Sequence, residues 1–352
     1  MGESLARHTT LGLGGPAGTW TNAASELALV DAVRDSGDDL FILGGGSNVV
    51  VADKGFSGAV VKVATRGLER FDDVSTVILT VQAGEVWDDV CAFAVAEGLA
   101  GIECLSGIPG TAGAAPIQNI GAYGREVADS LVGVRAFDRG RDEVIELEAE
   151  KCGFAYRMSR FKRCPGRFVI LAISLRLEPG GSSWPIRHPA VARELDVSIG
   201  DTVPLARVRR AVLSLRRAKG MVLDPGDPDT TSTGSFFVNP LLSAEEFGEL
   251  EARIESQGGG LIGPIPHERE ADKVKVHAAW LIEKAGFKKG YGKSGTVAIS
   301  SKHALALTHL GKGTTADLVS LAEEIAAVVR ERFGITLVPE PIFVGHDWEP
   351  PC

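Results

Sequence analysis

The sequence predicts an α+β protein that folds in two or three units. The chain has 352 residues, which is long for a single hydrophobic core. Short β-like runs and helical segments alternate along it, and no repeat of about 20–50 residues recurs, which excludes a solenoid. Hydrophobic residues make up 44% and charged residues 24% of the chain, which is an ordinary globular composition.

In the first part of the chain, strands and helices are expected in turn. Ser25 should cap a helix that runs to about Val33, and Gly98 should end a helix from Glu85 to Glu97. A loop-rich insertion is expected between Gly180 and Asp201. Apolar and β-branched runs predict strands over residues 38–43, 49–53, 76–84, 132–138, 142–148 and 167–178.

In the second part, a basic helix over 205–219 is followed by a linker rich in Pro, Gly, Asp and Thr, residues 223–234. Ser243 and Glu246 have the spacing of a capping box. VKVHAAWLIEKAG (274–286) predicts a helix and ALALTHL (304–310) a strand. Gly334 should end the last long helix, and ITLVPEPIFVG (335–345) should form a strand pair or one bent strand.

Charge and cysteine content exclude several classes of function. The net charge of −9 disfavours nucleic acid or an anionic membrane as a partner, so an anionic substrate would need a local basic pocket. Five cysteines without a C-x-x-C pair and seven histidines without metal spacing suggest neither a disulfide framework nor a metal site. The N-terminus does not resemble a signal peptide, and no apolar run approaches about 20 residues. We therefore expect a cytoplasmic, soluble protein.

Two glycine-rich stretches indicate a bound dinucleotide. LGGGSNVVV (43–51) is followed by β-branched residues rather than by a helix, so it is not a Rossmann fingerprint, and taken alone it is a tight turn. Its backbone N–H groups can still surround a diphosphate. SGIPGTAGAAPIQNIGAYG (106–124) has five glycines and four alanines in 19 residues, which lets a backbone approach a large flat ligand.

A serine in an unusual setting is the first candidate for chemistry. TGSFFVNP (233–240) places Ser235 between a glycine and two phenylalanines. A buried hydroxyl without a partner costs roughly 1–3 kcal/mol. Ser235 therefore either bonds to backbone or gives a proton to a ligand. HLGKGTT (309–315) is similar to a P-loop but lacks the glycine required at Ala306, so it predicts a loop and a helix cap.

These motifs, together with GFAYRMSRFK, AAWLIEKAGFKKG, KHALAL and PEPIFVG, occur in an order that resembles the UDP-N-acetylenolpyruvoylglucosamine reductase family over nearly the whole chain. The resemblance implies an FAD-binding pair of subdomains of the PCMH or vanillyl-alcohol-oxidase type plus a C-terminal α+β substrate-binding domain. The implied limits are 1–66, completed by 335–352, for the first FAD-binding subdomain, 67–222 for the second, and 227–334 for the substrate-binding domain.

The resemblance also implies the reaction and its cofactors. A member of this family takes hydride from NADPH onto FAD and reduces the enolpyruvyl group of UDP-N-acetylglucosamine enolpyruvate, which gives UDP-N-acetylmuramate for peptidoglycan precursor synthesis. By the family pattern, Ser235 is the proton donor, Arg157 stabilises the enolate and Glu340 assists protonation. Without the resemblance, Arg157 and Glu340 would be interpreted as surface ion pairs.

By the same pattern, Arg216, Lys219, Asn239, Lys275 and His303 contact the substrate, with Arg216 and Lys219 expected on one helix face. FAD is expected to be noncovalent, because neither glycine-rich loop contains a histidine or cysteine that could form a covalent link. The expected FAD-binding residues are Gly44, Gly45, Gly46, Ser47, Asn48, Ile108, Pro109, Gly110, Thr111, Gly113, Ala114, Gln118, Asn119, Gly121, Ala122 and Tyr123.

Three positions differ from the pattern that the resemblance implies. Val238 stands where many members have lysine, His188 stands roughly where one subgroup has a substrate-covering tyrosine, and Ala114-Ala115 replaces a serine pair of other members. Two other functions stay open at this point. One is an FAD-dependent oxidase of the same cofactor fold, and the other is a non-catalytic sensor of nucleotide sugars. The sequence is compatible with a monomer but does not decide the oligomeric state.

Overall fold

The computed structural model describes residues 2–256, 263–270, 272–293 and 295–348, and the chain forms two compact units. Unit 1 contains residues 1–3, 17–46 and 57–223, and unit 2 contains residues 4–16, 47–56 and 224–352. One crossing between the units therefore falls within the first glycine-rich stretch, between Gly46 and Ser47. The three-part division expected from the sequence stays a prediction.

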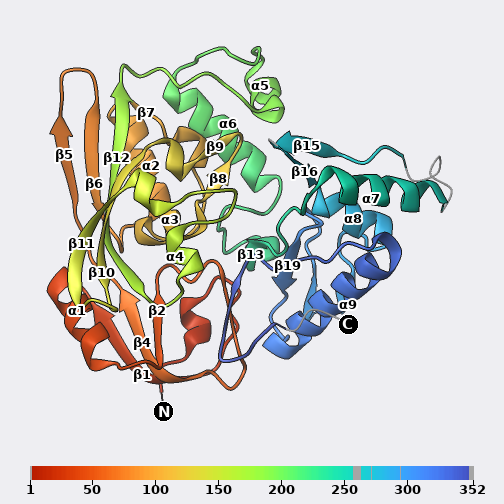
Figure 1. Ribbon diagram of the computed structural model, residues 1–352, viewed down its shortest axis with the longest axis horizontal. Helices are drawn as coiled ribbons and strands as arrows, with labels where there is room; N and C mark the ends of the chain where they lie inside the picture. The colour runs from red at the N-terminus through yellow and green to blue at the C-terminus, as the bar shows by residue number, and fades with distance from the viewer. Residues whose placement is uncertain (1, 257–262, 271, 294, 349–352) are drawn as a thin grey trace. The chain divides into compact units, whose positions relative to one another are not determined.

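Unit 1 begins with a small sheet of β1 (Ala17–Ala23), β4 (Phe56–Val63) and β2 (Leu40–Leu43), in that order (Figure 1). Strands β2 and β4 are parallel, with Leu43 opposite Lys62. Helix α1 (Glu26–Asp35) precedes β2, and the Ser25 hydroxyl accepts a hydrogen bond from the Ala28 N–H at 3.2 Å. The predicted cap is therefore confirmed.

The larger sheet of unit 1 is antiparallel. Its central strand β12 is almost wholly buried over its first six residues, as expected from its continuous apolar sequence. The strands run in the order β11 (Glu143–Glu148), β10 (Leu131–Asp138), β12 (Phe168–Pro179), β6 (Val77–Gln82) and β5 (Leu68–Asp72), and β7 (Leu99–Ala100) also pairs with β12 (Figure 1).

Helix α2 (Trp87–Ala96) contributes the fully buried Trp87 to the main core of unit 1, which also contains Phe137 and Leu79 from the large sheet. A second, smaller core lies between α5 and α6 and includes Val191 and Val208. The remaining elements of unit 1 are α3 (Ala115–Gln118), α4 (Arg160–Arg163), α5 (Pro189–Leu195), α6 (Leu205–Arg217) and the short hairpin of β8 (Gly121–Ala122) and β9 (Arg125–Glu126).

Unit 2 contains two small antiparallel sheets and one parallel strand pair. The first sheet is β13 (Ser232–Ser235), β19 (Ala306–His309), β18 (Val297–Ile299) and β17 (Gly292–Lys293), and the second is β14 (Leu241–Leu242), β16 (Lys273–Val276) and β15 (His267–Glu270). The parallel pair joins β3 (Val49–Val51) to β20 (Ile342–Val344). Strand, glycines and strand follow one another from β2 to β3, so the non-Rossmann interpretation of LGGGSNVVV is confirmed.

The helices of unit 2 are α7 (Ala244–Ser256), α8 (Ala278–Ala285) and α9 (Thr315–Phe333). Their apolar faces enclose a core with Phe236, Phe237 and Ile325. The capping box of α7 is confirmed, because Ser243 and Glu246 exchange hydrogen bonds of 2.6 and 3.1 Å. Thr314 caps α9, so HLGKGTT is a loop and a helix cap as predicted.

Three expectations of secondary structure were wrong in detail. VKVHAAWLIEKAG is not one helix, because Val274 and Val276 pair as strand β16 before α8 begins at Ala278. The loop-rich insertion contains helix α5, which begins at Pro189 after the side chain of His188 caps it. In the last segment only residues 342–344 form a strand, because its earlier part makes single backbone bonds with the Ser235 segment instead of a ladder.

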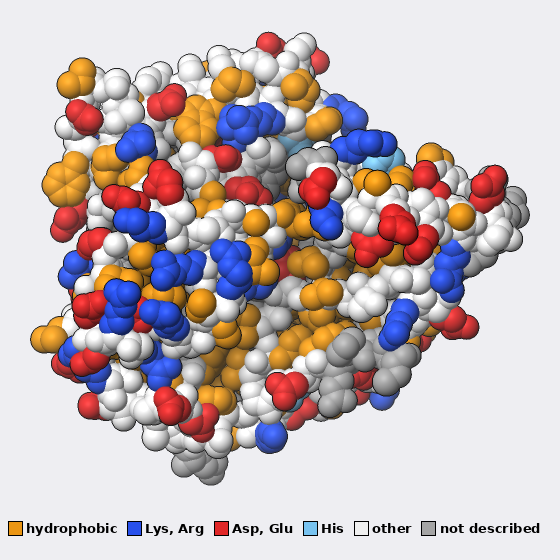
Figure 2. Space-filling view, in the orientation of Figure 1, with side chains coloured by type: hydrophobic (Ala, Val, Ile, Leu, Met, Phe, Trp, Pro, Cys, Tyr) orange, Lys and Arg blue, Asp and Glu red, His pale blue; other side chains and the backbone are white. Residues whose placement is uncertain are grey.

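The surface over the sheets of unit 1 carries basic and acidic side chains side by side (Figure 2). Ion pairs such as Arg70 with Asp72 at 2.7 Å and Lys151 with Glu148 at 3.1 Å account for part of this mixture. No helix among the described residues is long and apolar enough to cross a membrane.

Candidate active site

The two glycine-rich stretches touch each other in unit 1. A Cβ added to Gly44 would lie 2.8 Å from Thr111 Oγ1, and one added to Gly45 would lie 2.6 Å from Gly110 Cα. Side chains do not tolerate such distances, so these positions require glycine. Among the described residues, the N–H groups of Gly44, Gly45 and Gly46 donate to no acceptor. They are available to an anion.

Helix α2 anchors the second stretch at its beginning. The Asp88 carboxylate accepts a hydrogen bond of 2.6 Å from the Gly107 N–H and two from the Arg209 guanidinium of α6, at 2.6 and 2.9 Å. Burial alone would raise the pKa of Asp88, but the bonds from Arg209 and Gly107 together bring it below the ordinary value. The Trp87 N–H donates to the Gly110 carbonyl at 3.1 Å, which fixes the chain three residues further on.

Two residues near the end of the second stretch, and one residue that bonds to it, adopt left-handed backbone although none is glycine. Asn119, Tyr123 and Arg157 have φ of 44°, 53° and 52°. Such conformations cost about 1–3 kcal/mol each and tend to cluster at functional sites. The Arg157 guanidinium donates to the carbonyls of Asn119 at 3.1 Å and Gly121 at 2.7 Å, so it is held against the stretch. The structure thus places Arg157 beside several of the expected FAD-binding residues.

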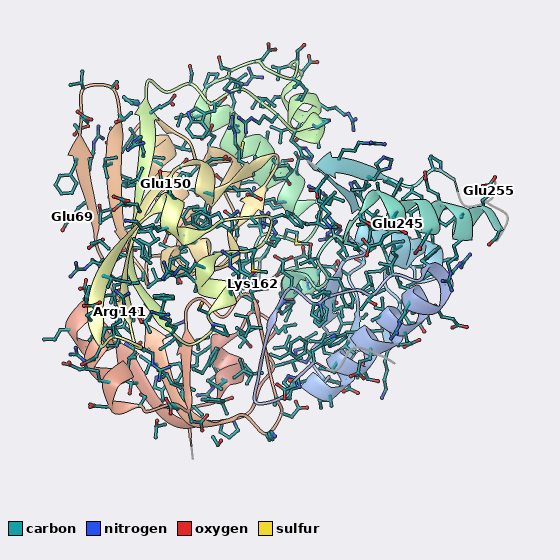
Figure 3. All side chains as sticks on the ribbon, viewed as in Figure 1. Glu69, Arg141, Glu150, Lys162, Glu245 and Glu255 are labelled. Atoms are coloured by element: carbon teal, nitrogen blue, oxygen red, sulfur yellow. The ribbon has the colours of Figure 1, made fainter. Side chains whose placement is uncertain are left out.

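Helix α4 reinforces the same region. Lys162, labelled in Figure 3, belongs to α4 and donates to Gln118 Oε1 at 2.9 Å and to the Arg157 carbonyl at 3.2 Å. Ser159, which caps α4, donates to the Ile117 carbonyl at 2.8 Å. Ser159 and Lys162 of the motif YRMSRFK therefore hold helix α3 and the backbone of Arg157 in place.

A second arginine of unit 1 has an unsatisfied donor. Arg216 donates from Nη2 to the Met221 carbonyl at 2.9 Å, while its buried Nε has no acceptor among the described residues. Burial lowers the pKa of the Arg216 guanidinium, Tyr123 and Asp88 oppose that shift, and the charge of Arg157 lowers the pKa further. A buried guanidinium with an unsatisfied donor favours an anionic ligand.

The predicted helix face holds only in part. Helix α6 ends at Arg217, so Lys219 lies in the following turn, where its N–H donates to the Arg216 carbonyl at 3.1 Å. The His188 ring meets the Tyr123 ring edge-on with centroids 5.2 Å apart. Its Nδ1 accepts from the Ala190 N–H at 3.1 Å, so the ring is fixed at the start of α5.

Unit 2 brings Ser235 and Glu340 together through the backbone. Ser235 is half-buried at the end of β13, after Gly234 with φ of 76°. The next residue, Phe236, accepts a hydrogen bond of 2.8 Å from the Glu340 N–H. Asn48 bonds to the same segment, because its Nδ2 donates to the Glu340 carbonyl at 3.3 Å and its own carbonyl accepts from the Ile342 N–H at 3.0 Å.

An aromatic cluster holds the Ser235 segment from the other side. Phe236 and Phe237 are fully buried, with ring centroids 5.2 Å apart. The Trp348 ring packs against both at 6.4 and 6.2 Å, and against Phe343 at 5.7 Å. The side chain of Thr233, two residues before Ser235, is buried with no hydrogen-bond partner among the described residues.

The other expected substrate contacts of unit 2 already serve the fold. Asn239 Oδ1 accepts from the Ala278 N–H at 3.0 Å at the start of α8. Lys275 lies in β16 and forms an ion pair of 2.8 Å with Glu268, which lowers the pKa of that carboxyl. His303 belongs to a turn in which its N–H donates to Ser300 Oγ at 3.2 Å. Each could still present other atoms to a ligand.

The expected site residues therefore form two groups. Arg157, Arg216, Lys219 and the FAD-binding residues from Gly44 to Gly46 and from Ile108 to Tyr123 belong to unit 1. Ser235, Glu340, Asn239, Lys275, His303, Ser47 and Asn48 belong to unit 2.

Comparison with known proteins gives the family. Residues 227–344 match the C-terminal domain of UDP-N-acetylenolpyruvoylglucosamine reductase, and residues 20–148 match an FAD binding domain. The chain is 52% identical to the UDP-N-acetylenolpyruvoylglucosamine reductase of Thermobifida fusca, over 97% of this chain and 96% of that one. It belongs to this family. The Streptomyces coelicolor reductase is 50% identical over 97% of this chain and 89% of its own.

A solved structure supports the fold. The UDP-N-acetylenolpyruvylglucosamine reductase of Thermus caldophilus has the same fold, with a TM-score of 0.65 over 97% of both chains and 24% sequence identity. The predicted α+β class with an FAD-binding part is therefore confirmed. In this member of the reductase family, the free N–H groups of Gly44 to Gly46 and the small residues around Gly110 fit a dinucleotide that carries a diphosphate.

The sequence did not point to every residue that shapes the reductase site. Asp88 and Trp348 carry no motif, and Lys62 is a single lysine in an apolar strand. Lys62 gave no usable signal, because a polar residue between two buried ones is the ordinary alternation of a strand. Trp348 gave none, since it contacts Phe236 and Phe237, more than 100 positions away.

We predict that Asp88→Asn destabilises unit 1. At neutral pH the loss should be about 1–2 kcal/mol in the free energy of unfolding, because the bonds from Gly107 and Arg209 lose their charge assistance. The folded pKa of Asp88 lies below the unfolded value of about 3.9, so this contribution is present above that pH and is lost as the pH falls through the folded pKa. Urea unfolding from pH 7 to pH 3 checks this.

Asp89→Asn is the matched control, because Asp89 is exposed on the same helix. It should change the free energy of unfolding by less than about 0.5 kcal/mol. A gap between Asp88→Asn and the wild type that widens on acidification would contradict the prediction.

A second prediction concerns the aromatic cluster of unit 2. Trp348→Ala should lower the free energy of unfolding by about 2–4 kcal/mol, and Trp348→Phe by less than half as much, because phenylalanine keeps the ring contacts. Thermal unfolding followed by near-UV circular dichroism measures the loss. Phe71→Ala is the control, since that ring is 57% exposed. Equal losses from Trp348→Ala and Phe71→Ala would show that Trp348 does not support the cluster.

Proposed function

We propose that this chain is a cytoplasmic FAD-containing reductase that uses NADPH to reduce the enolpyruvyl group of UDP-N-acetylglucosamine enolpyruvate. The product is UDP-N-acetylmuramate, a precursor of peptidoglycan. The observation that carries the proposal is the pairing of the Ser235 and Glu340 segments by the bond between Glu340 N–H and the Phe236 carbonyl. The proposal is also supported by the 52% sequence identity with a named reductase over nearly the full chain.

Bound FAD supplies the hydride that is added to the enolpyruvyl double bond. The residues of the chain then have two tasks: to stabilise the negative charge that develops beside the substrate carboxylate, and to protonate the adjacent carbon. We assign the proton to the hydroxyl of Ser235. Ser235 is half-buried and stands between Gly234 and the buried Phe236, so its backbone position is fixed by the strand and by the core behind it.

We assign the stabilisation of charge to Arg157, and give Glu340 a part in the protonation. A guanidinium is permanently charged and presents a planar fork that suits a carboxylate. The carbonyls of Asn119 and Gly121 fix the Arg157 guanidinium in place, so little reorganisation is needed when charge develops. Glu340 is assigned to help the transfer of the proton, since its backbone is bonded to the segment that carries Ser235.

The phosphates of the substrate require cations, and the chain is acidic overall. We assign them to Arg216 and Lys219 in unit 1 and to Lys275 in unit 2, with Asn239 and His303 as further contacts. The unsatisfied Nε of Arg216 supports its part in this assignment. Lys275 would give up its ion pair with Glu268 to bind a phosphate. Its net contribution to the binding free energy would therefore be the phosphate contact less the lost ion pair.

The visible spectrum of the purified protein tests the function. We expect a yellow protein whose flavin is released by acid precipitation, is bleached by NADPH without oxygen, and regains its colour when UDP-N-acetylglucosamine enolpyruvate is added. Oxygen consumption with a small alcohol but no reaction with NADPH would indicate the oxidase. A colourless protein that still binds the nucleotide sugar would indicate the sensor.

We predict that Ser235→Ala separates the two half-reactions. Reduction of the flavin by NADPH should keep its rate, because it needs no proton from Ser235. Reoxidation by the enolpyruvyl substrate should slow by about 10²–10⁴-fold, which is the usual range for a general acid. Anaerobic stopped-flow absorbance measures both steps.

Ser235→Cys is the informative partner variant, because a thiol is also small and can give a proton. It should recover part of the second rate, whereas Thr233→Val, which removes a neighbouring hydroxyl, controls for changes in the strand. If Ser235→Ala slows both half-reactions equally, or neither, the hydroxyl is not the proton donor.

A further inference from the structure

Lys62 lies at the point where the first glycine-rich stretch leaves its strand. It stands in β4 opposite Leu43, the last residue of the parallel strand β2. Its ammonium donates to the carbonyl of Gly44, the residue that follows Leu43. In sheets with parallel strands, ligands bind outside the carboxyl ends of the strands, which is where Gly44 to Gly46 begin.

The charge of Lys62 is not neutralised in unit 1. Its ammonium is half-buried, and the carbonyl of Gly44 is its only hydrogen-bond partner among the described residues. Burial lowers the pKa of this ammonium, and the neighbouring charge of Arg66 lowers it further. Arg66 itself is exposed and forms an ion pair of 3.1 Å with Glu85. The exposed Arg66 is thus paired with a carboxylate, while the half-buried Lys62 is paired with none among the described residues.

A half-buried ammonium costs free energy that an apolar side chain would not, and a methionine would fill a similar volume without desolvating a charge. The carbonyl that Lys62 holds belongs to Gly44, the first of three consecutive glycines whose N–H groups have no acceptor among the described residues. A cation bonded to a loop with three unused donors, and with no carboxylate paired to it among the described residues, describes an anion site.

We propose that Lys62 is a further FAD-binding residue, whose ammonium joins the N–H groups of Gly44, Gly45 and Gly46 in holding the FAD diphosphate. The proposal rests on the FAD site of the proposed function. A dianionic diphosphate offsets both causes that lower the pKa of Lys62, since it supplies the missing counter-charge to the ammonium. Lys62 also positions the loop, because it holds the Gly44 carbonyl while the N–H groups point elsewhere.

Flavin binding to the apoprotein tests the proposal. FAD is removed by acid precipitation or by high salt, and quenching of flavin fluorescence on titration with FAD gives Kd for the wild type, Lys62→Met, Lys62→Arg and Arg66→Met. We expect Lys62→Met to raise Kd roughly 10–100-fold, because a charge-assisted hydrogen bond is lost. Lys62→Arg should keep most of the affinity, and Arg66→Met, which removes a nearby exposed charge, should change Kd less than about threefold.

Two further readouts separate binding of the diphosphate from support of the loop. The wild type should bind FAD more weakly as salt increases, and Lys62→Met should show a smaller salt dependence, since one ionic contact is missing. Thermal unfolding of the apoprotein should differ little between the two. Equal Kd values, an equal loss in Arg66→Met, or a Lys62→Met apoprotein that is itself much less stable would overturn the proposal. A wild type that binds no FAD would refute the proposed function instead.

Discussion

The contact of Gly44 and Gly45 with Gly110 and Thr111 is the constraint on which unit 1 depends. A side chain at Gly45 would meet the backbone of Gly110, and one at Gly44 would meet the side chain of Thr111, so the first loop has no room for side chains at these two positions. Among the described residues, three consecutive N–H groups of this loop have no acceptor, which is unusual for backbone that is partly buried. Asp88, Trp87 and the α4 segment hold the second loop against the first. These hydrogen bonds therefore stabilise a site whose own N–H donors have no acceptor among the described residues.

Unit 2 supports its two candidate catalytic residues in another way. The segments of Ser235 and Glu340 are joined by backbone hydrogen bonds, so the backbone fixes where both side chains start. The buried phenylalanines that follow Ser235 anchor the strand, and Trp348 covers them. A buried threonine without a partner, Thr233, lies two residues away. Such a hydroxyl contributes nothing to the stability of the free protein, as is common beside functional groups.

Much of this arrangement could be predicted from local sequence signals. Ser25, Ser243 and Thr314 start their helices as expected, because caps depend on residues within one turn. The strand β16 was missed, because VKV continues into AAWLIEKAG without a break and only pairing with β14 and β15 decides its conformation. Helix α5 was missed for a related reason, since a helix of seven residues that begins with a proline gives a weak periodic signal.

The residues of the candidate site also divide into those that local motifs indicate and those that only long-range contacts reveal. Motif residues such as Ser235, Arg157 and the glycines could be named as candidates from the sequence, since they lie in motifs that the resemblance rests on. Lys62, Asp88 and Trp348 could not, because their importance comes from long-range contacts that no spacing encodes. The left-handed backbone of Asn119 and Arg157 was also invisible, since neither residue type requires it.

The pairing of β3 with β20 joins two segments that are made at different times. Val49, Val50 and Val51 are synthesised well before their partner strand, since Val49 pairs with Ile342. Until the partner strand is made, a short, wholly apolar, β-branched segment has no partner in its own sheet, and such segments are prone to intermolecular association. A pairing between segments so far apart in sequence raises the contact order of unit 2 and slows its folding. Loss of β20 would therefore expose β3 as well.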